Sequence, residues 1–209
     1  MTSTPSTPHD PPALDAETAR ADRRWGLLAL VTGVLGFYGA ATLVYERLQL
    51  YLDAGHRTSC DINSWLSCGT VMRTPQAEAF GFPNPFIGIV AYAVVLAIAF
   101  AVLAGARFAA WYWWCVQIGV SLGWVFILWL WWQTTFQINA LCLYCMLVWI
   151  VQTVLFVHTT ARNVRAGVLP GPGSDGRSAG HWAWLVTAVL LVAIFGTVLI
   201  RFAGVIFPA

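Results

Sequence analysis

The chain has 209 residues, of which 59% are hydrophobic and only 10% are charged. Its mean hydropathy is +0.70 and its formal net charge is +2. A soluble domain carries about a quarter of charged residues, so this composition excludes an ordinary soluble protein, and the small net charge gives no reason to expect a nucleic-acid partner. We therefore expect an integral membrane protein that forms one helical bundle.

Residues 1–24 are rich in Thr, Pro, Asp and Ala and contain no apolar run, which predicts a disordered cytoplasmic tail. The first apolar run starts only after Arg23 and Arg24 and is long, which argues against a cleavable signal peptide. It extends from Trp25 to Tyr45. Because about 20 apolar residues cross a bilayer, this run is the first predicted span.

Four further spans are expected after the polar loop 46–85. No Asp, Glu, Lys or Arg occurs from Phe108 to Ala161, so this stretch is expected to hold two spans joined by a hairpin at Gln133–Asn139. A cytoplasmic linker at 163–181 precedes the last segment, 182–209, which holds a fifth span and a short tail. The four predicted spans are 85–104, 110–131, 141–160 and 182–200.

The basic residues, all of them Arg, set the expected orientation in the cell (inner) membrane, because arginines accumulate on the cytoplasmic side. With the N-terminus inside, the cytoplasmic arginines are Arg20, Arg23, Arg24, Arg107, Arg162, Arg165 and Arg177. The fewer outer ones are Arg47, Arg57, Arg73 and Arg201. This topology places the 46–85 loop and the start of the fourth span on the outer face, where disulfides persist.

Cys142 and Cys145 form a Cys-x-x-Cys motif at the start of the fourth span. Residues three apart share one helix face with Cβ atoms about 5–6 Å apart, so a small adjustment allows a disulfide. A helix N-terminus also stabilises the thiolate, the reactive form in disulfide exchange. The motif therefore indicates a redox-active dithiol, and the alternative is a pair of buried cysteines that only pack.

Cys60 and Cys68 lie in the polar loop. Eight residues span roughly 26 Å as a strand and about 12 Å as a helix, whereas a disulfide needs Cα atoms within about 7 Å. The segment must bend back if the pair bonds, and Asp61, Asn63 and Ser64 suit a turn. Such a loop is either a mobile carrier of a dithiol or a static structural bridge. Zinc is disfavoured, because only one pair has the short spacing of zinc ligands, and no metal is expected.

Several other residues have two interpretations. Asn84, between Pro83 and Pro85, is either a helix cap or a hydrogen-bond donor to a buried ligand. Trp124 and Trp129 are placed either to line a pocket for a flat ring or to face lipid. Cys115 stands alone in the third span and is expected to be a packing residue.

Three segments together resemble the bacterial homologues of vitamin K epoxide reductase. They are Cys60–Met72 (CDINSWLSCGTVM), Asn84–Gly88 (NPFIG) and Cys142–Cys145 (CLYC). The resemblance covers residues 25–162 and implies an all-α membrane protein, with a four-helix catalytic bundle around a quinone pocket and a fifth transmembrane helix added to it.

The resemblance also implies roles for individual residues. Cys142 and Cys145 would form the active-site disulfide, with Cys145 facing the quinone. Cys60 and Cys68 would be a shuttle pair, in which Cys68 attacks Cys142 and Cys60 meets a thiol partner. The implied quinone contacts are Asn84, Met72, Thr74, Phe86 and Trp149. Trp149 stands where the animal members have a Tyr, so that contact departs from the family pattern.

The implied function is that of a quinone-dependent, disulfide-forming oxidoreductase, with menaquinone or ubiquinone as the electron acceptor. Many bacterial members carry a thioredoxin-like domain after a fifth span. This chain ends at Ala209, so a separate thioredoxin-fold protein on the outer face is the expected partner. The alternatives are a quinone-epoxide reductase, a non-catalytic scaffold with structural disulfides, and the unrelated four-span quinone-linked disulfide oxidases.

Overall fold

The computed structural model describes residues 13–170 and 179–206, and the elements in these ranges are helical. In chain order they are α1 (Ala13–Leu52), α2 (Cys68–Met72), the 3-10 helix η1 (Pro75–Glu78), α3 (Pro85–Leu103), α4 (Ala110–Trp132), the π-helical turn η2 (Gln133–Ile138), α5 (Leu143–Arg165) and α6 (Ala179–Ile206). Five of these helices are long and apolar enough to cross a membrane. The predicted fold class is therefore confirmed.

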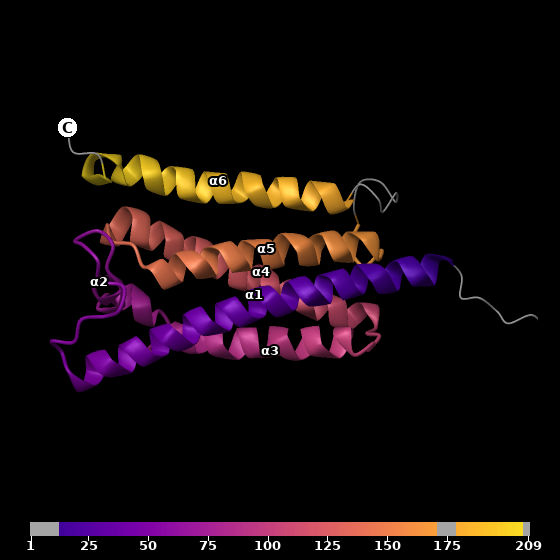
Figure 1. The fold of residues 1–209 in the computed structure, drawn as a ribbon, viewed down its shortest axis with the longest axis horizontal. Coiled ribbons are helices and arrows are strands. Elements are labelled where there is room, and N and C mark those ends of the chain that lie inside the picture. The colour runs from indigo at the N-terminus through magenta and orange to yellow at the C-terminus, as the bar shows by residue number, and fades with distance from the viewer. Residues whose placement is uncertain (1–12, 171–178, 207–209) are drawn as a thin grey trace, which may run out of the picture.

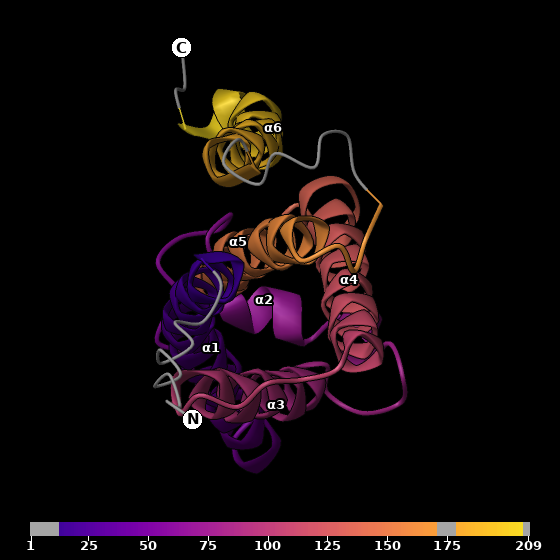
Figure 2. The same cartoon turned by 90° about the vertical axis from the view of Figure 1, so that its right-hand side faces the viewer.

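The long helices α1, α3, α4 and α5 run side by side and surround a common centre, while α6 lies outside them against α5 (Figures 1 and 2). Helix α1 packs against α3 and α5, and α5 also packs against α4. Two ends of this bundle can be distinguished. The cysteine end contains α2, η1 and the loop between α1 and α3, and the opposite end contains the start of α1 and the α3–α4 turn (Figure 1).

The helix bounds follow the sequence signals closely for three of the spans. Helix α3 begins at Pro85, where a proline loses no hydrogen bond because the first N–H groups of a helix are unpaired anyway. Helices α4 and α5 fill the uncharged stretch, and the turn between them ends at Asn139. Asn139 has a φ of 55°, a left-handed conformation that asparagine tolerates better than most residues.

Helix α1 is longer than the predicted first span, because it begins at Ala13 and ends at Leu52. The predicted disordered tail is thus helical from Ala13 onward, and residues 1–12 lie outside the described part of the chain. A tertiary contact accounts for the difference, since the Arg162 Nε–H donates to Asp22 Oδ1 at 2.8 Å and ties this polar segment to α5. Of the predicted 163–181 linker, Ala166–Pro170 follow the end of α5, and residues 171–178 lie outside the described ranges.

Candidate redox site

The loop that carries Cys60 and Cys68 bends back on itself, and the two cysteines form a disulfide with Cα atoms 5.6 Å apart. The carboxylate of Asp61 organises the bend. It accepts hydrogen bonds from the Thr58 N–H at 2.8 Å, the Ser67 hydroxyl at 2.6 Å and the Gly69 N–H at 2.9 Å. The bend therefore brings the two Cα atoms within the distance of about 7 Å that a disulfide requires.

The charge of Asp61 is part of this arrangement. Burial alone would favour the neutral acid, but the hydrogen bonds from Ser67, Gly69 and Thr58 lower the pKa of Asp61 to about 2. The close approach also explains Gly69, because a Cβ atom there would lie 2.9 Å from Asp61 Oδ2. At neutral pH the loop is thus closed around a carboxylate.

The second half of the loop is attached to the start of α5. The Ser67 N–H donates to the Leu141 carbonyl at 2.9 Å, and the Leu141 N–H donates to the Trp65 carbonyl at 2.8 Å. The Ser67 hydroxyl also accepts from the Thr70 N–H and so caps α2. This attachment places Cys68, the first residue of α2, beside Cys142, which immediately precedes α5.

The sulfur atoms of three cysteines meet at this point. Cys68 Sγ lies 2.8 Å from Cys142 Sγ, and the sulfurs of Cys60, Cys68 and Cys142 all lie within 4.8 Å of one another. These three side chains are at most 2% exposed. A disulfide sulfur is not a thiolate ligand, so this grouping is suited to thiol–disulfide exchange rather than to metal binding.

The Cys-x-x-Cys motif opens α5, with Cys142 at the N-cap and Cys145 in the first turn. Both are free thiols in the structure, in which the loop pair is oxidised and the Cys142–Cys145 pair is reduced. Cys145 is partly buried and lies on the wall of an internal cavity. Both cysteines of the motif line the cavity, and Cys142 also contacts the loop disulfide.

Cys60 is held down by contacts to the residue before it. The Ser59 N–H donates to Glu46 Oε1 at 3.0 Å, and the Ser59 hydroxyl lies 3.1 Å from the Tyr144 hydroxyl. Glu46 also contacts His56 Nε2 at 2.9 Å. With Cys60 only 2% exposed, another protein cannot reach its sulfur until this part of the loop moves.

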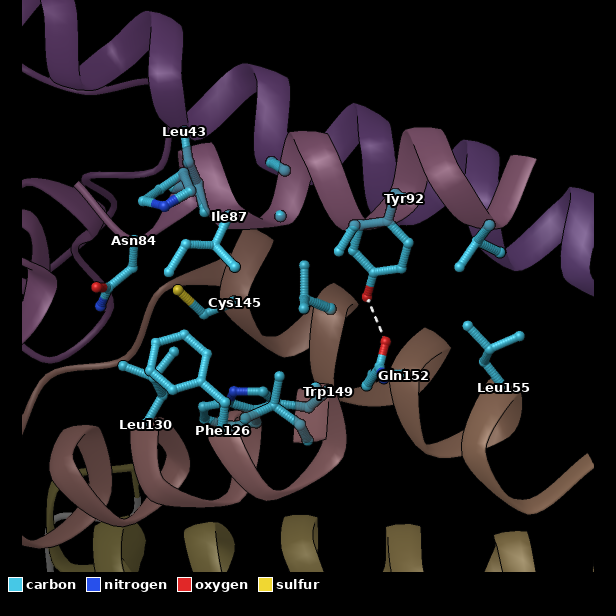
Figure 3. Close-up of a pocket in the computed structure, with 18 of the residues that line it drawn as sticks. Leu43, Asn84, Ile87, Tyr92, Phe126, Leu130, Cys145, Trp149, Gln152 and Leu155 are labelled. Atoms are coloured by element: carbon cyan, nitrogen blue, oxygen red, sulfur yellow. Dashed lines mark hydrogen bonds between the residues drawn. The ribbon is translucent and has the colours of Figure 1, made fainter. Parts of the chain in front are cut away.

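The cavity has a volume of about 460 Å³ and lies between α1, α3, α4 and α5. Pockets for small organic molecules have volumes of this order. Cys145 and Asn84 lie near one end of it, the Tyr92–Gln152 hydrogen bond crosses it further along, and Leu155 lies beyond (Figure 3). Most of the wall is apolar, and it extends toward the opposite end as far as Tyr112 and Cys115.

The structure separates the predicted quinone contacts into two groups. Met72, Asn84 and Trp149 line the cavity. Thr74 and Phe86 do not: the Thr74 hydroxyl donates to the Val71 carbonyl at 2.7 Å, and Phe86 is 40% exposed on the outer side of α3. Neighbouring residues of a helix point in different directions, and at this position Ile87 faces the cavity instead.

The structure also places Trp124 and Trp129, for which two interpretations were open, and Cys115. Trp124 stacks on Phe156 and donates to the Thr153 hydroxyl, and Trp129 stacks on Phe126 while 38% exposed, so neither lines the cavity. Cys115, expected to pack, is exposed and lies on the far wall. Trp129 thus contacts Phe126, a residue of the cavity wall, and Trp124 of α4 packs against Phe156 and Thr153 of α5.

Asn84 makes no side-chain cap bond to α3. Its Nδ2 donates to the Gln76 carbonyl at 2.8 Å, and its Oδ1 accepts from the Ala79 N–H at 3.0 Å. One hydrogen of the Asn84 amide therefore has no partner within the described residues. The indole N–H of Trp149 likewise has no hydrogen bond to any residue that the structure describes, although the residue is 1% exposed.

Sequence reasoning missed the most buried polar pair of the cavity. The Tyr92 hydroxyl donates to Gln152 Oε1 at 3.1 Å, and Gln152 Nε2 donates to the Val120 carbonyl at 2.9 Å. Two glycines make room for the pair: a Cβ at Gly36 would lie 2.4 Å from the Tyr92 ring, and one at Gly123 would lie 2.7 Å from Gln152 Nε2. The sequence did contain a signal for this pair, because Gln152 is a polar side chain within a predicted membrane span.

The fold and the site define an all-helical, multi-pass membrane protein with a thiol–disulfide centre at one end of its bundle. Residues 27–160 match the model of the Vitamin K epoxide reductase family, and the chain belongs to this family. It is accordingly a membrane oxidoreductase of the vitamin K epoxide reductase type. A search of curated proteins found no match to the chain.

Proposed function

We propose that this protein oxidises a thioredoxin-fold dithiol and passes the two electrons to a quinone. The observation that carries the proposal is a continuous series of sulfurs. It begins at the loop disulfide, continues through Cys68 and Cys142 with their sulfurs 2.8 Å apart, and ends at Cys145 on the wall of an apolar cavity. The cavity supplies a lipid-accessible oxidant with a place to bind, and the loop supplies a protein thiol with a disulfide to attack.

The proposed exchange begins with a partner thiolate that attacks Cys60 and releases Cys68 as a thiolate. The partner's second thiol then attacks the partner's own sulfur in the mixed disulfide, which forms the partner's disulfide and releases Cys60 as a thiol. Cys68 attacks Cys142 of the Cys142–Cys145 disulfide and releases Cys145. Cys60 finally displaces Cys142, which restores the loop disulfide and leaves Cys142 and Cys145 reduced. The structure has the thiol and disulfide pairs of this last state.

In the closing step Cys142 and Cys145 re-form their disulfide, and the quinone accepts two electrons and two protons to become a hydroquinone. The net reaction is partner dithiol plus quinone to partner disulfide plus hydroquinone, so atoms and electrons balance. The free amide hydrogen of Asn84 and the indole N–H of Trp149 are the donors proposed for the quinone carbonyls. The far part of the cavity is apolar and suits an isoprenoid tail.

We place the cysteine end on the outer face of the cell membrane, where a separate thioredoxin-fold protein would meet it. The support is the distribution of arginines, which gather near the start of α1, the α3–α4 turn and the end of α5. Disulfides also persist on that face. The burial of Cys60 means that the loop opens before the partner reacts.

The decisive experiment uses the purified protein with a reduced thioredoxin-fold protein and either menaquinone or ubiquinone. Cys145→Ser is expected to abolish hydroquinone formation, because Cys142 then has no partner with which to re-form the disulfide that gives two electrons to the quinone. Cys115→Ser, which also removes one thiol, is the matched control and is expected to retain turnover. Undiminished hydroquinone formation by Cys145→Ser would refute the assignment. A quinone epoxide offered in place of the quinone tests the alternative substrate.

A further inference from the structure

The cavity has a roof at the cysteine end, formed by η1 and the residues on either side of it. Ala77 of η1 lines the cavity together with Met72 and Asn84. The backbone of this roof fixes the Asn84 side chain, because the Gln76 carbonyl accepts from Nδ2 and the Ala79 N–H donates to Oδ1. The Asn84 N–H also donates to the Ala77 carbonyl at 2.9 Å. The direction of the remaining amide hydrogen therefore depends on where η1 lies.

A 3-10 helix of four residues has little stability of its own, so contacts from elsewhere must hold it. Arg47 of α1 provides them. One guanidinium nitrogen donates to Glu78, the last residue of η1, and another donates to the carbonyl of Met72, the last residue of α2. The Tyr51 hydroxyl, one turn further along α1, also donates to Glu78. The guanidinium lies 4.6 Å from the centre of the Tyr51 ring.

These contacts connect α1 to Asn84 through η1. Arg47 and Tyr51 hold Glu78 at one end of the roof, and the neighbouring residues Gln76 and Ala79 hold the Asn84 amide. Asn84 and Cys145 lie at the same end of the cavity (Figure 3). A shift of η1 thus changes the orientation of the amide beside the cavity, while the sulfur atoms lie outside this chain of contacts.

We propose that Glu78 and Arg47 are positioning residues for the contact between Asn84 and the quinone. The proposal rests on the proposed function, in which Asn84 donates to a quinone carbonyl. Glu78 acts through the backbone of η1 and does not line the cavity itself, whereas Arg47 both holds Glu78 and lines the cavity. The Arg47 and Glu78 side chains are 14% and 32% exposed, so water weakens their attraction and the effect of losing it is moderate.

Glu78 is a cleaner test position than Arg47, because Arg47 lines the cavity itself and also contacts the carbonyl that ends α2. Glu78→Ala is expected to raise the KM for the quinone about fivefold to tenfold. The KM for the thiol partner and the rate of exchange between Cys68 and Cys142 are expected to stay unchanged. Glu78→Gln keeps an oxygen that accepts from both Arg47 and Tyr51, so it is expected to recover most of the loss.

The comparison variants are Asn84→Ala and the double variant Glu78→Ala with Asn84→Ala. If Glu78 acts through Asn84, the double variant has the same quinone KM as Asn84→Ala alone. Tyr51→Phe removes one hydrogen bond to Glu78 and leaves the ion pair, so a smaller rise is expected. This milder variant keeps the proposal testable if Glu78→Ala fails to fold.

The outcomes separate the two levels of the proposal. If the wild-type protein forms no hydroquinone from any quinone offered, the proposed function is wrong. If it does, and Asn84→Ala raises the quinone KM while Glu78→Ala and Tyr51→Phe do not, the positioning role alone is wrong. The positioning role is also wrong if Glu78→Ala raises the KM values for quinone and thiol partner equally, or if its effect adds to that of Asn84→Ala.

Discussion

The two ends of the bundle are held together in different ways. At the opposite end, side chains on three helices bond directly to one another. The Arg162 Nε–H donates to Asp22 at 2.8 Å, and its guanidinium lies 3.4 Å from the centre of the Trp113 ring. Asn163, fully buried, donates to Gln117 Oε1 at 3.0 Å. These bonds fix α1, α4 and α5 relative to each other.

At the cysteine end, the bonds run mainly between a loop and the helix ends. Asp61 holds the loop to itself, Leu141 holds its second half to α5, and Glu46 holds its first half to α1. Contacts of this kind can open without separating the helices, because few of them contribute to the helix interfaces. The opposite end is therefore a rigid frame, whereas the loop at the cysteine end can open and exchange its disulfide partner.

The largest effect is expected from Cys60→Ser. Cys68 then has no loop partner, and its sulfur already lies beside Cys142, so a Cys68–Cys142 disulfide should form and persist. Turnover should stop, and most of the protein should carry this link in a non-reducing peptide map. The melting temperature should change little, since the frame at the opposite end is untouched. A map without the link would mean that the two sulfurs do not exchange.

Arg162→Ala should have the converse effect, a large loss of stability. Removing one member of a buried ion pair typically costs about 3–5 kcal/mol, and the partial exposure of Asp22 favours the lower figure of about 3 kcal/mol. Thermal unfolding in detergent measures the change, and Arg107→Ala, exposed at the same end, is the matched control. The kcat of the folded fraction should be preserved. A fall in kcat without a fall in stability would contradict the assignment of Arg162 to the rigid frame rather than to the redox reaction.

Asp61→Asn should loosen the loop by a smaller amount. The folded-state pKa of about 2 lies below the ordinary value of 3.8, so the carboxylate's contribution is fully present above about pH 4 and is lost as pH falls toward 2. Hydrogen bonds to a charged group contribute roughly 1.5–3 kcal/mol, so loop opening should become at least about tenfold more frequent in the variant.

Reduction of the Cys60–Cys68 disulfide by a phosphine measures this opening, because a phosphine remains active in acid. The wild-type rate should be flat from pH 7 to about pH 4 and should rise below it, while the Asp61→Asn rate should be high throughout. Asp53→Asn changes a carboxylate that is exposed near the end of α1 and serves as the control. Identical profiles for Asp61→Asn and wild type would show that Asp61 does not close the loop.

The features that the sequence predicted well are those with a local cause. The five spans follow from apolar runs of sufficient length, and the place of Cys142 and Cys145 follows from the start of such a run. The helical segment before Trp25 was missed because its fixing contact, Asp22 to Arg162, joins residues that are far apart in the chain. The composition of the N-terminal segment gives no information about a contact between residues so far apart.

Within the site, the residues that line the cavity depend on which face of a helix points inward. Phe86 and Ile87 are both apolar and adjacent, and only packing against the other helices decides that Ile87 lines the cavity. The Tyr92–Gln152 and Arg47–Glu78 pairs were missed for a related reason. Each joins two elements that become neighbours only in the folded bundle, so neither partner is conspicuous in its own segment.

The smallest effect concerns the far part of the cavity, between the two ends. Gly119 lines it, and a Cβ atom added there meets no atom within 4 Å, so Gly119→Leu should fold and narrow the cavity. If an isoprenoid tail occupies this part, the KM for a long-tailed quinone should rise a few-fold while that for a tail-less quinone stays constant. Gly196→Leu on α6 also adds a side chain into open space but away from the cavity, and it should change neither value. An equal rise for both quinones would place the obstruction at the ring, and no rise for either would mean that the tail leaves the bundle nearer to Cys145.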